Sequence, residues 1–255
     1  MRLENKTALI TGASRNIGRE VALTFAREGA DLLLNTRSSQ QELEEVAAQC
    51  RELGVKTHTV IGDVSDSARV SAMVDEGIQA LGKIDILVSN VAVRPHKPIL
   101  EVSDEEWHQV MGINLDSAFY LCRAVLPGMM ERRNGSIVAL GGQAAITGRP
   151  ETALVTAAKT GLVGLIRAIA AEMAPYNVRA NMVNPGATDT TREHPEWYPD
   201  FSEIPRDSDE HLKSIPMHRQ GTVQDIASAC LFFASDESSY ITGDRLNVMG
   251  GRYII

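Results

Sequence analysis

A glycine-containing turn near the start of the chain has the composition of a phosphate-binding loop. Residues 11–18 are Thr-Gly-Ala-Ser-Arg-Asn-Ile-Gly, and they stand between a short β-forming run and a segment with helical periodicity. Gly12 permits a tight turn there, and Gly18 lets the helix approach the strand closely. Because the free N–H groups at the start of a helix favour a negatively charged group, the turn indicates a site for the pyrophosphate of a dinucleotide.

The residues at the end of the second β-forming run indicate which dinucleotide is bound. A carboxylate there would hydrogen-bond the ribose 2′-hydroxyl of NAD and repel a 2′-phosphate, but residues 35–38 are Asn-Thr-Arg-Ser. Arg37, together with Arg15 in the turn, offers guanidinium groups that bind phosphate in a bidentate manner. The sequence therefore predicts NADP(H) in preference to NAD(H). The alternative is that both arginines are only solvated.

These residues need a framework of strands and helices to hold them. Short apolar runs rich in β-forming residues alternate with longer segments of helical period along almost the whole chain. Since parallel strands need crossover connections, the alternation predicts an α/β fold with a Rossmann-type, doubly wound parallel sheet of about seven strands. No linker divides the chain, so we expect a single dinucleotide-binding domain over residues 1–255. The predicted strands are residues 7–11, 31–35, 57–61, 84–89, 136–140, 178–183 and 245–249.

The composition is that of one ordinary globular domain. The 255 residues include 25 Lys and Arg against 33 Asp and Glu, a formal charge of −8, which argues against nucleic acid and acidic membrane surfaces as partners. No secretory signal is visible, and Arg167 and Glu172 interrupt the most apolar stretch, so no transmembrane helix is expected. Cys50, Cys122 and Cys230 have no metal-ligand spacing. We expect a cytoplasmic protein without a metal site, in which the cysteines are buried.

Several further motifs resemble those of the short-chain dehydrogenase/reductase family. Asp63 and Val64 follow the third run, residues 89–92 (Ser-Asn-Val-Ala) end the fourth, and residues 184–186 (Asn-Pro-Gly) follow the sixth. The resemblance extends over residues 3–255 and implies a redox protein that binds a nicotinamide dinucleotide. The cofactor-binding residues that it implies, together with those of the turn, are Gly12, Ser14, Arg15, Asn16, Ile17, Arg37, Ser38, Asp63, Val64, Asn90, Ala92, Lys159, Pro185, Gly186, Thr188 and Thr190.

Two residues depart from the family's nucleotide-binding motifs. Asn16 stands where the middle glycine of the turn is usual, and Ala92 replaces a glycine that normally lies near the cofactor. Asn tolerates a positive φ better than most residues, so we expect the turn to survive with Asn16 in that conformation. Ala92 adds a methyl group, and we expect binding to persist with some adjustment.

The catalytic positions that the resemblance implies are only partly kept. Most family members use a Tyr as acid or base, a Lys four residues later, a Ser thirteen residues before the Tyr, and an Asn. Asn114 and Lys159 match this pattern, but Gly142 occupies the Ser position and Val155 the Tyr position. Valine cannot transfer a proton, and glycine has no side-chain hydrogen bond. No other tyrosine lies near enough along the chain to replace the missing one, so the usual carbonyl chemistry lacks its acid.

Two functions are therefore open. The first is an NADP(H)-dependent oxidoreductase with a non-standard active site, acting on a conjugated enoyl or carbonyl substrate. His96 is the candidate proton donor, because the unperturbed pKa of histidine is about 6.5. Arg94 and Gln143 are candidate substrate contacts, with Lys97 and His194 as further polar residues of the same loops, and each has a solvated loop residue as its alternative. The second function is a catalytically silent nucleotide-binding protein with a regulatory or assembly role.

Two longer features point to a lid and to an interface. Residues 188–220 break the alternation with prolines, aromatics and acids, which favours an excursion over the ligand-binding edge that acts as a substrate lid rather than a plain surface loop. Segments 120–126 and 160–174 are apolar on more than one face, which predicts a subunit interface. Members of the family are commonly dimers or tetramers. We therefore expect a homotetramer or homodimer that acts on a small-molecule substrate.

Overall fold

Seven parallel strands form one sheet in the computed structural model, which describes residues 1–191 and 208–254. Their order is β3-β2-β1-β4-β5-β6-β7, so the direction in which the chain adds strands reverses between β1 and β4. Ligands of open α/β sheets bind beside such a reversal, at the carboxyl ends of the strands. The strands are β1 (Thr7–Thr11), β2 (Asp31–Thr36), β3 (Thr57–Ile61), β4 (Ile86–Ser89), β5 (Gly135–Leu140), β6 (Val178–Pro185) and β7 (Arg245–Val248).

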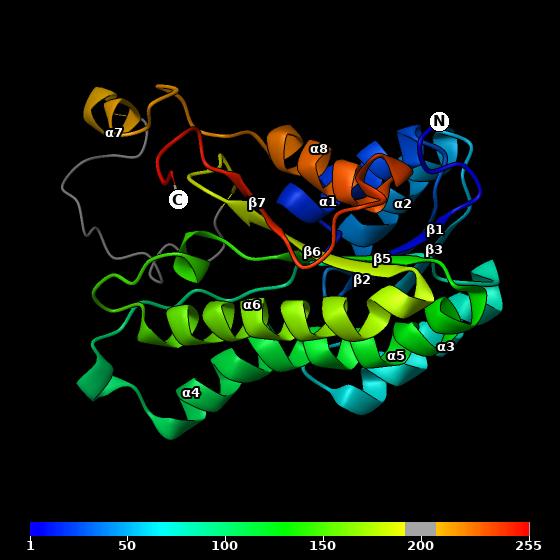
Figure 1. Cartoon of the computed structure of the whole chain (residues 1–255), viewed down its shortest axis with the longest axis horizontal. Coiled ribbons are helices and arrows are strands. Elements are labelled where there is room, and N and C mark those ends of the chain that lie inside the picture. Colours follow the sequence, from blue (N-terminus) through cyan, green and yellow to red (C-terminus); the bar gives the residue numbers. More distant parts are fainter. Residues whose placement is uncertain (192–207, 255) are drawn as a thin grey trace.

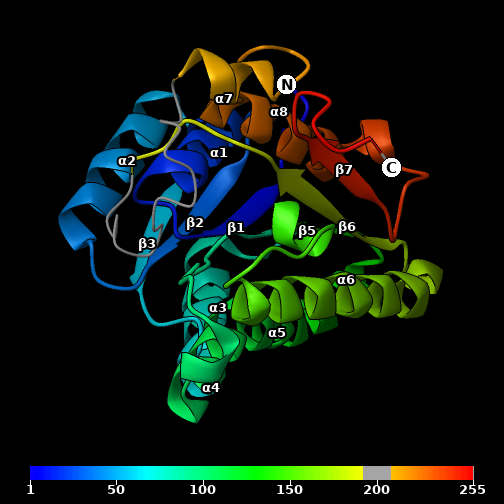
Figure 2. The ribbon, with the colours of Figure 1, turned by 90° about the vertical axis from the view of Figure 1, so that its left-hand side faces the viewer.

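Helices cover both faces of this sheet (Figures 1 and 2). The first face is covered by α1 (Asn16–Arg27), α2 (Gln40–Glu52) and α8 (Val223–Ala234). The second is covered by α3 (Ser67–Leu81), α5 (Ser117–Arg132) and α6 (Ala153–Met173). The remaining helical segments are η1 (Ile99–Glu101), α4 (Asp104–Met111), η2 (Gly112–Asp116), η3 (Gln143–Ala145), η4 (Ala174–Tyr176), α7 (Asp209–Lys213) and η6 (Asp236–Ser238).

Each strand divides its side chains between two cores. Ala8 and Ile10 of β1 pack with the helices of the first face, whereas Leu9 packs with those of the second. This follows from the period-2 alternation of a strand. Because both faces are covered, the central strands are buried along their length, and all five residues of β1 and all six of β5 are buried, whereas the edge strands β3 and β7 are mostly half-buried.

The predicted fold class is confirmed, and the strand boundaries differ by at most two residues. The first and third predicted strands match β1 and β3 at both ends, while β4 begins at Ile86 rather than at residue 84. The three cysteines are buried and free, as expected. Burial raises the pKa of Cys122 and Cys230 to about 12, so neither thiol is a nucleophile at neutral pH.

One helical stretch, Ala153–Tyr176, is long and apolar enough to cross a membrane, with a hydropathy of 1.5. Half of its most apolar window is buried inside the protein, where α6 packs on the second face of the sheet. The central helix of a doubly wound sheet has the same length and composition, so this signal is weak.

The predicted excursion at residues 188–220 is described only at its two ends. Residues 192–207, and with them His194, lie outside the described residues. At its start, Thr188 pairs with Gly221 as an isolated parallel bridge. Towards its end lies α7, which Ser208 caps by accepting a hydrogen bond from the backbone of His211 at 3.2 Å.

Candidate nucleotide and substrate site

The turn between β1 and α1 leaves no space for side chains at its two glycines. Gly12 has φ +63°, and a Cβ there would lie 3.0 Å from the amide nitrogen of Asn90. A Cβ on Gly18 would lie 2.1 Å from the carbonyl oxygen of Gly12. Asn90 fixes the turn from β4, since its side-chain amide donates to the carbonyls of Thr11 at 3.0 Å and Gly12 at 3.3 Å. The two glycines thus let the turn pack closely against the loop after β4 and against the start of α1, which is the tight geometry that a phosphate-binding turn requires.

The N-cap side chain of α1 makes no capping hydrogen bond with the helix. Its N-cap residue, Arg15, has extended backbone angles, and the first turn of the helix carries no acidic residue. The first N–H groups of a helix need acceptors and carry a partial positive charge. Ser14 lies beside this point and is within 3.5 Å of the hydroxyl of Thr36 at the end of β2. This helix start is suited to an anionic group.

Asn16 has φ 50°, which confirms the expected positive φ at this position. Its side chain also makes two hydrogen bonds with the backbone of Thr191. The amide nitrogen donates to the carbonyl of Thr191 at 3.0 Å, and the amide oxygen accepts from the Thr191 N–H at 3.0 Å. The phosphate turn is therefore tied to the segment that follows β6.

The residues expected near the adenosine half follow β2 and β3. Arg37 and Ser38 are exposed just after β2, with no acidic residue between 32 and 41. Asp63 accepts hydrogen bonds from both the N–H and the hydroxyl of Ser65, at 2.9 and 2.7 Å, so its carboxylate shapes the loop after β3. Val64 is buried beside it.

Asn114 lies in η2, a π-helical turn between α4 and α5, where it is 2% exposed. Its side chain accepts from the N–H of Val93 and donates to the carbonyl of Val93, both at 2.8 Å. These bonds use both polar ends of the amide and hold the loop that carries Ala92, Arg94 and His96. Asn114 is thus a positioning residue in this structure, and single π-helical turns are frequent at functional sites.

The polar residues of the loop after β4 differ in exposure and in their partners. Ala92 and Arg94 are exposed and His96 is half-buried. Lys97 is engaged elsewhere, because its ammonium contacts both carboxylate oxygens of Glu106 at 2.7 and 2.8 Å. Lys97 therefore belongs to the base of the loop and not to a substrate contact.

Lys159 is 4% exposed and lies on α6 next to the end of β5. Its ammonium donates to the carbonyl of Leu140 at 2.6 Å. Among the residues that the structure describes, no carboxylate lies within ion-pairing distance of it. Burial, with a smaller contribution from the charge of Arg94, lowers the pKa of Lys159 from 10.5 to about 7.

The segment that follows β5 contains Gly142, which the sequence pattern matches to a serine position. The N–H of Gly142 donates to the side-chain oxygen of Asn184 at 3.2 Å, and Asn184 donates in turn to Asn247 at 2.9 Å. A Cβ on Gly142 would have only the carbonyl oxygen of Pro185 within 4 Å, at 3.9 Å. Val155 is buried, so this part of the site has no proton donor at positions 142 and 155.

The residues after β6 complete the edge. Gly186 continues the pairing with β7 through its N–H, which donates to the carbonyl of Val248 at 2.9 Å. Thr188 is buried and its hydroxyl donates to the carbonyl of Gly186 at 3.3 Å. Pro185 and Thr190 are half-buried on either side of this turn.

The structure adds two residues that the sequence did not single out as parts of the site. Asn184 positions Gly142, and it belongs to a motif already recognised. Tyr253, five residues beyond the end of β7, accepts a hydrogen bond from the side-chain amide of Gln143. Only the adjacent Gly250 and Gly251 hint in the sequence that the chain turns back here.

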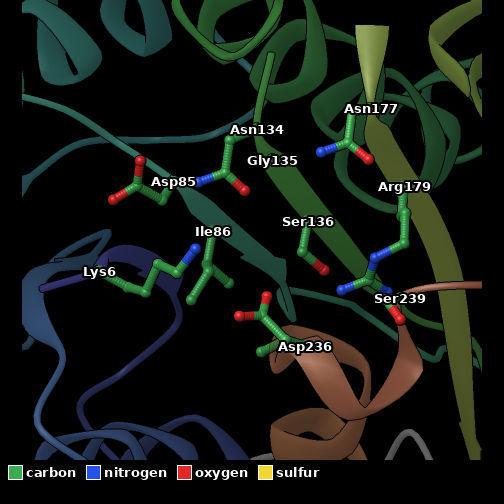
Figure 3. Close-up of a pocket in the computed structure, with 11 residues that line it drawn as sticks. Lys6, Asp85, Ile86, Asn134, Gly135, Ser136, Asn177, Arg179, Asp236 and Ser239 are labelled. Carbon is green, nitrogen blue, oxygen red and sulfur yellow. The ribbon is translucent and has the colours of Figure 1, made fainter. Parts of the chain in front are cut away.

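A small polar cavity lies at the opposite edge of the sheet, at the amino ends of the strands (Figure 3). Its volume is about 60 Å³, which is enough for a few water molecules but not for a dinucleotide. Asp85 on its wall accepts from the N–H of Thr7 at 3.0 Å and pairs with Lys83 at 2.8 Å. Arg179 donates to Ser238 at 2.8 Å. These charges join the amino ends of the strands to their neighbours, away from the proposed nucleotide site.

Comparisons with known proteins agree with this arrangement. Residues 12–252 match a family model described as Enoyl-(Acyl carrier protein) reductase. The chain is 34% identical over 255 residues to 3-oxoacyl-[acyl-carrier-protein] reductase of Thermotoga maritima, with 100% of both chains covered. It is 35% identical over 257 residues to the protein of the same name from Escherichia coli, again with 100% of both covered. A solved structure of carveol dehydrogenase from Mycobacterium avium in complex with NAD is 31% identical, has a TM-score of 0.91 and covers 98% of each chain.

Proposed function

Because the chain belongs to the short-chain dehydrogenase/reductase family of oxidoreductases, we propose that it is an NADP(H)-dependent member that reduces or oxidises a carbonyl or conjugated enoyl group. The observation that carries the proposal is the buried ammonium of Lys159 at the carboxyl edge of the sheet. A buried cation without a carboxylate partner is unfavourable unless a ligand supplies acceptors. The hydroxyl groups of a nicotinamide ribose are suitable acceptors at this place.

The residues of the first turn fit the pyrophosphate of such a cofactor. The start of α1, which its N-cap side chain does not cap, offers N–H donors, and Gly12 and Gly18 allow the tight packing of the turn from which these donors project. Asn90 and Asp63 shape the adjoining loops through the hydrogen bonds described above. A nicotinamide bound across this edge supplies a hydride, or accepts one, at the substrate carbon.

A preference for NADP(H) is supported by the charges after β2. Arg37 is exposed at the point where the ribose of the adenosine half is expected, and no acid stands beside it to repel a 2′-phosphate. A hydrogen bond to a charged group contributes about 1.5 to 3 kcal/mol, which corresponds to a preference of about 10- to 100-fold. The relatives named above as 3-oxoacyl-[acyl-carrier-protein] reductases give the first substrate class to test, a β-keto thioester.

The active site in this proposal is atypical. With Gly142 and Val155 at the serine and tyrosine positions, neither position can supply a proton, and loss of a positioned acid lowers the rate by about 10²- to 10⁴-fold. The residues that remain have supporting roles: Lys159 binds the ribose, Asn114 holds the loop of residues 92–96, and the charge of Arg94 acts on Lys159. The empty position beside Gly142 is the observation that favours the second candidate, a nucleotide-binding protein without turnover.

The test measures binding and turnover separately. Dissociation constants for NADPH and NADH are obtained from nicotinamide fluorescence, and NADPH consumption is followed with acetoacetyl-coenzyme A, crotonyl-coenzyme A and phenanthrenequinone. We expect NADPH to bind at least about tenfold more tightly than NADH and to be consumed with one of these acceptors. Tighter binding of NADH would refute the cofactor preference. Tight NADPH binding without consumption by any acceptor would favour the second candidate.

A subunit interface on α5 and α6 is part of the proposal. Phe119 of α5 is 42% exposed, and the guanidinium of Arg123 lies 4.9 Å from the centre of its ring. On α6, Gly164 has open space around it, which would allow another helix to approach closely. An exposed aromatic residue on α5 and an open glycine on α6 support association between two copies of the chain.

A further inference from the structure

The chain beyond β7 turns back over the carboxyl edge of the sheet. Gly250 and Gly251 have φ of +60° and +84°, and the N–H of Arg252 donates to the carbonyl of Met249 at 3.2 Å, which closes a tight turn. The turn is held from the other side, because the N–H of Met217 donates to the carbonyl of Gly250 at 3.0 Å. Figure 1 shows this end of the chain (red) on the side of the sheet where α7 lies. Residues 249–252 are therefore held in place by hydrogen bonds on both sides of the turn.

Tyr253 is brought by this turn to the substrate side of the site. The side-chain amide of Gln143 donates to its phenolic oxygen, and the guanidinium of Arg252 lies 5.9 Å from the centre of its ring. A phenol can accept one hydrogen bond and still donate its own hydrogen. Among the described residues, no acceptor takes that hydrogen. The O–H group of a half-buried tyrosine is thus available to a ligand next to Gln143.

One short segment connects this phenol with the buried lysine. Lys159 contacts the carbonyl of Leu140, and Tyr253 contacts the side chain of Gln143, three residues later. The Cα atoms at the ends of residues 140–143 are at most about 11 Å apart, even in a fully extended chain. Gly142, which has no side chain, lies between them. The two polar groups are therefore held by one four-residue segment that contains the glycine at position 142.

We propose that Tyr253 is a catalytic residue of this protein, which donates the proton to the substrate oxygen in place of the tyrosine that position 155 lacks, and that Gln143 positions it. The inference rests on the proposed function. During reduction of a ketone, the carbonyl carbon receives a hydride, with its two electrons, from the reduced nicotinamide. The π-electron pair of the C=O bond moves to the oxygen, which takes the phenolic proton as the O–H bond of Tyr253 breaks. The phenolate then regains a proton from water.

Two variants distinguish this role from a structural one. In Tyr253→Phe the ring remains and only the hydroxyl is lost, so the tail can keep its place. Tyr240→Phe is the matched control, because Tyr240 is fully exposed and precedes the amino end of β7. With acetoacetyl-coenzyme A and NADPH, Tyr253→Phe should lower kcat by about 10²- to 10⁴-fold and leave the dissociation constant of NADPH within about twofold. Tyr240→Phe should leave both unchanged.

A binding measurement makes the outcome independent of turnover. In the presence of NADP⁺, acetoacetyl-coenzyme A binds without reacting, and calorimetry gives its dissociation constant. We expect Tyr253→Phe to weaken this binding by about fivefold, since one hydrogen bond to the keto oxygen is lost. In the wild type, kcat should also vary with pH along a limb that Tyr253→Phe lacks.

The possible results separate the two proposals. If the wild type consumes no NADPH but Tyr253→Phe still weakens binding of the β-keto thioester, the redox function fails while Tyr253 remains the group that contacts the substrate oxygen. If Tyr253→Phe retains both the kcat and the affinity of the wild type, the assignment of Tyr253 is wrong and the redox function stands. If the wild type does not bind the thioester at all, both the redox function with this substrate and the contact between Tyr253 and the substrate oxygen are refuted.

Discussion

Replacement of Lys159 by methionine should stabilise the cofactor-free protein, and by an amount that depends on pH. Methionine is unbranched, has a length close to that of lysine and carries no charge, so it fills the same buried space on α6. The substitution removes an amine whose protonated form is destabilised by burial in the folded protein. It also removes a donor to the carbonyl of Leu140, and this loss is the same at every pH in the range tested.

The magnitude follows from the pKa of Lys159, which burial lowers from 10.5 to about 7. Between these values the unfolded chain holds the proton and the folded chain releases it. The stability of the wild type therefore rises with pH through this range, and the full penalty is present below about pH 7. At about 1.4 kcal/mol per pH unit, the penalty is about 4 kcal/mol at pH 7 and about 2 kcal/mol at pH 9. The lost hydrogen bond offsets about 1 kcal/mol of the gain at both values.

Urea unfolding of the cofactor-free proteins at fixed protein concentration, followed by intrinsic fluorescence, measures this difference. Lys159→Met should exceed the wild type by about 3 kcal/mol at pH 7 and by about 1 kcal/mol at pH 9, with an unchanged slope in urea. Lys56→Met, at an exposed position, is the control and should change stability by less than about 0.5 kcal/mol. An advantage of Lys159→Met that stays constant or grows from pH 7 to pH 9 would refute the reasoning.

Two further predictions concern the turn and the interface. Gly18→Ala places a Cβ 2.1 Å from the carbonyl oxygen of Gly12, so the turn must shift, and we expect the dissociation constant of NADPH to rise at least about tenfold. An unchanged constant, measured by fluorescence titration, would show that this close approach is not needed. Phe119→Glu puts a charge on the proposed interface, so sedimentation velocity at micromolar concentration should show a smaller species than the wild type. The matched change Ile78→Glu, at an exposed position of α3, should leave the sedimentation coefficient unaltered, and an equal effect of both variants would contradict the interface.

The sequence predicted the parts of this molecule that depend on local pattern. β1 is buried along its whole length and was located at both ends from its apolar run, and the edge strand β3, which is mostly half-buried, was located from its run of β-branched residues. The conformation of Asn16 was predictable for a similar reason, because a tight turn at that point requires a residue that tolerates positive φ. Each of these inferences needs only a few neighbouring residues.

The features that were missed depend on contacts between distant segments. Tyr253 and Gln143 are 110 positions apart, and no local pattern shows that the turn at Gly250 brings them together. Lys97 was expected among the polar residues of the site, but it forms an ion pair with Glu106 in the first turn of α4, a contact between a loop and a helix that the sequence does not relate. The low pKa of Lys159 likewise arises from burial in the assembled core.

The pair of hydrogen bonds between Asn16 and Thr191 has a consequence for how the protein opens. Both bonds join a side chain to a main-chain group 175 residues away, so each forms only when both segments occupy their native positions. A glycine at position 16 would offer no such bonds. The turn between β1 and α1 and the start of the segment after β6 therefore form one cooperative unit. When a ligand binds the turn and stabilises the conformation of Asn16, amide hydrogen exchange at Thr191 should slow.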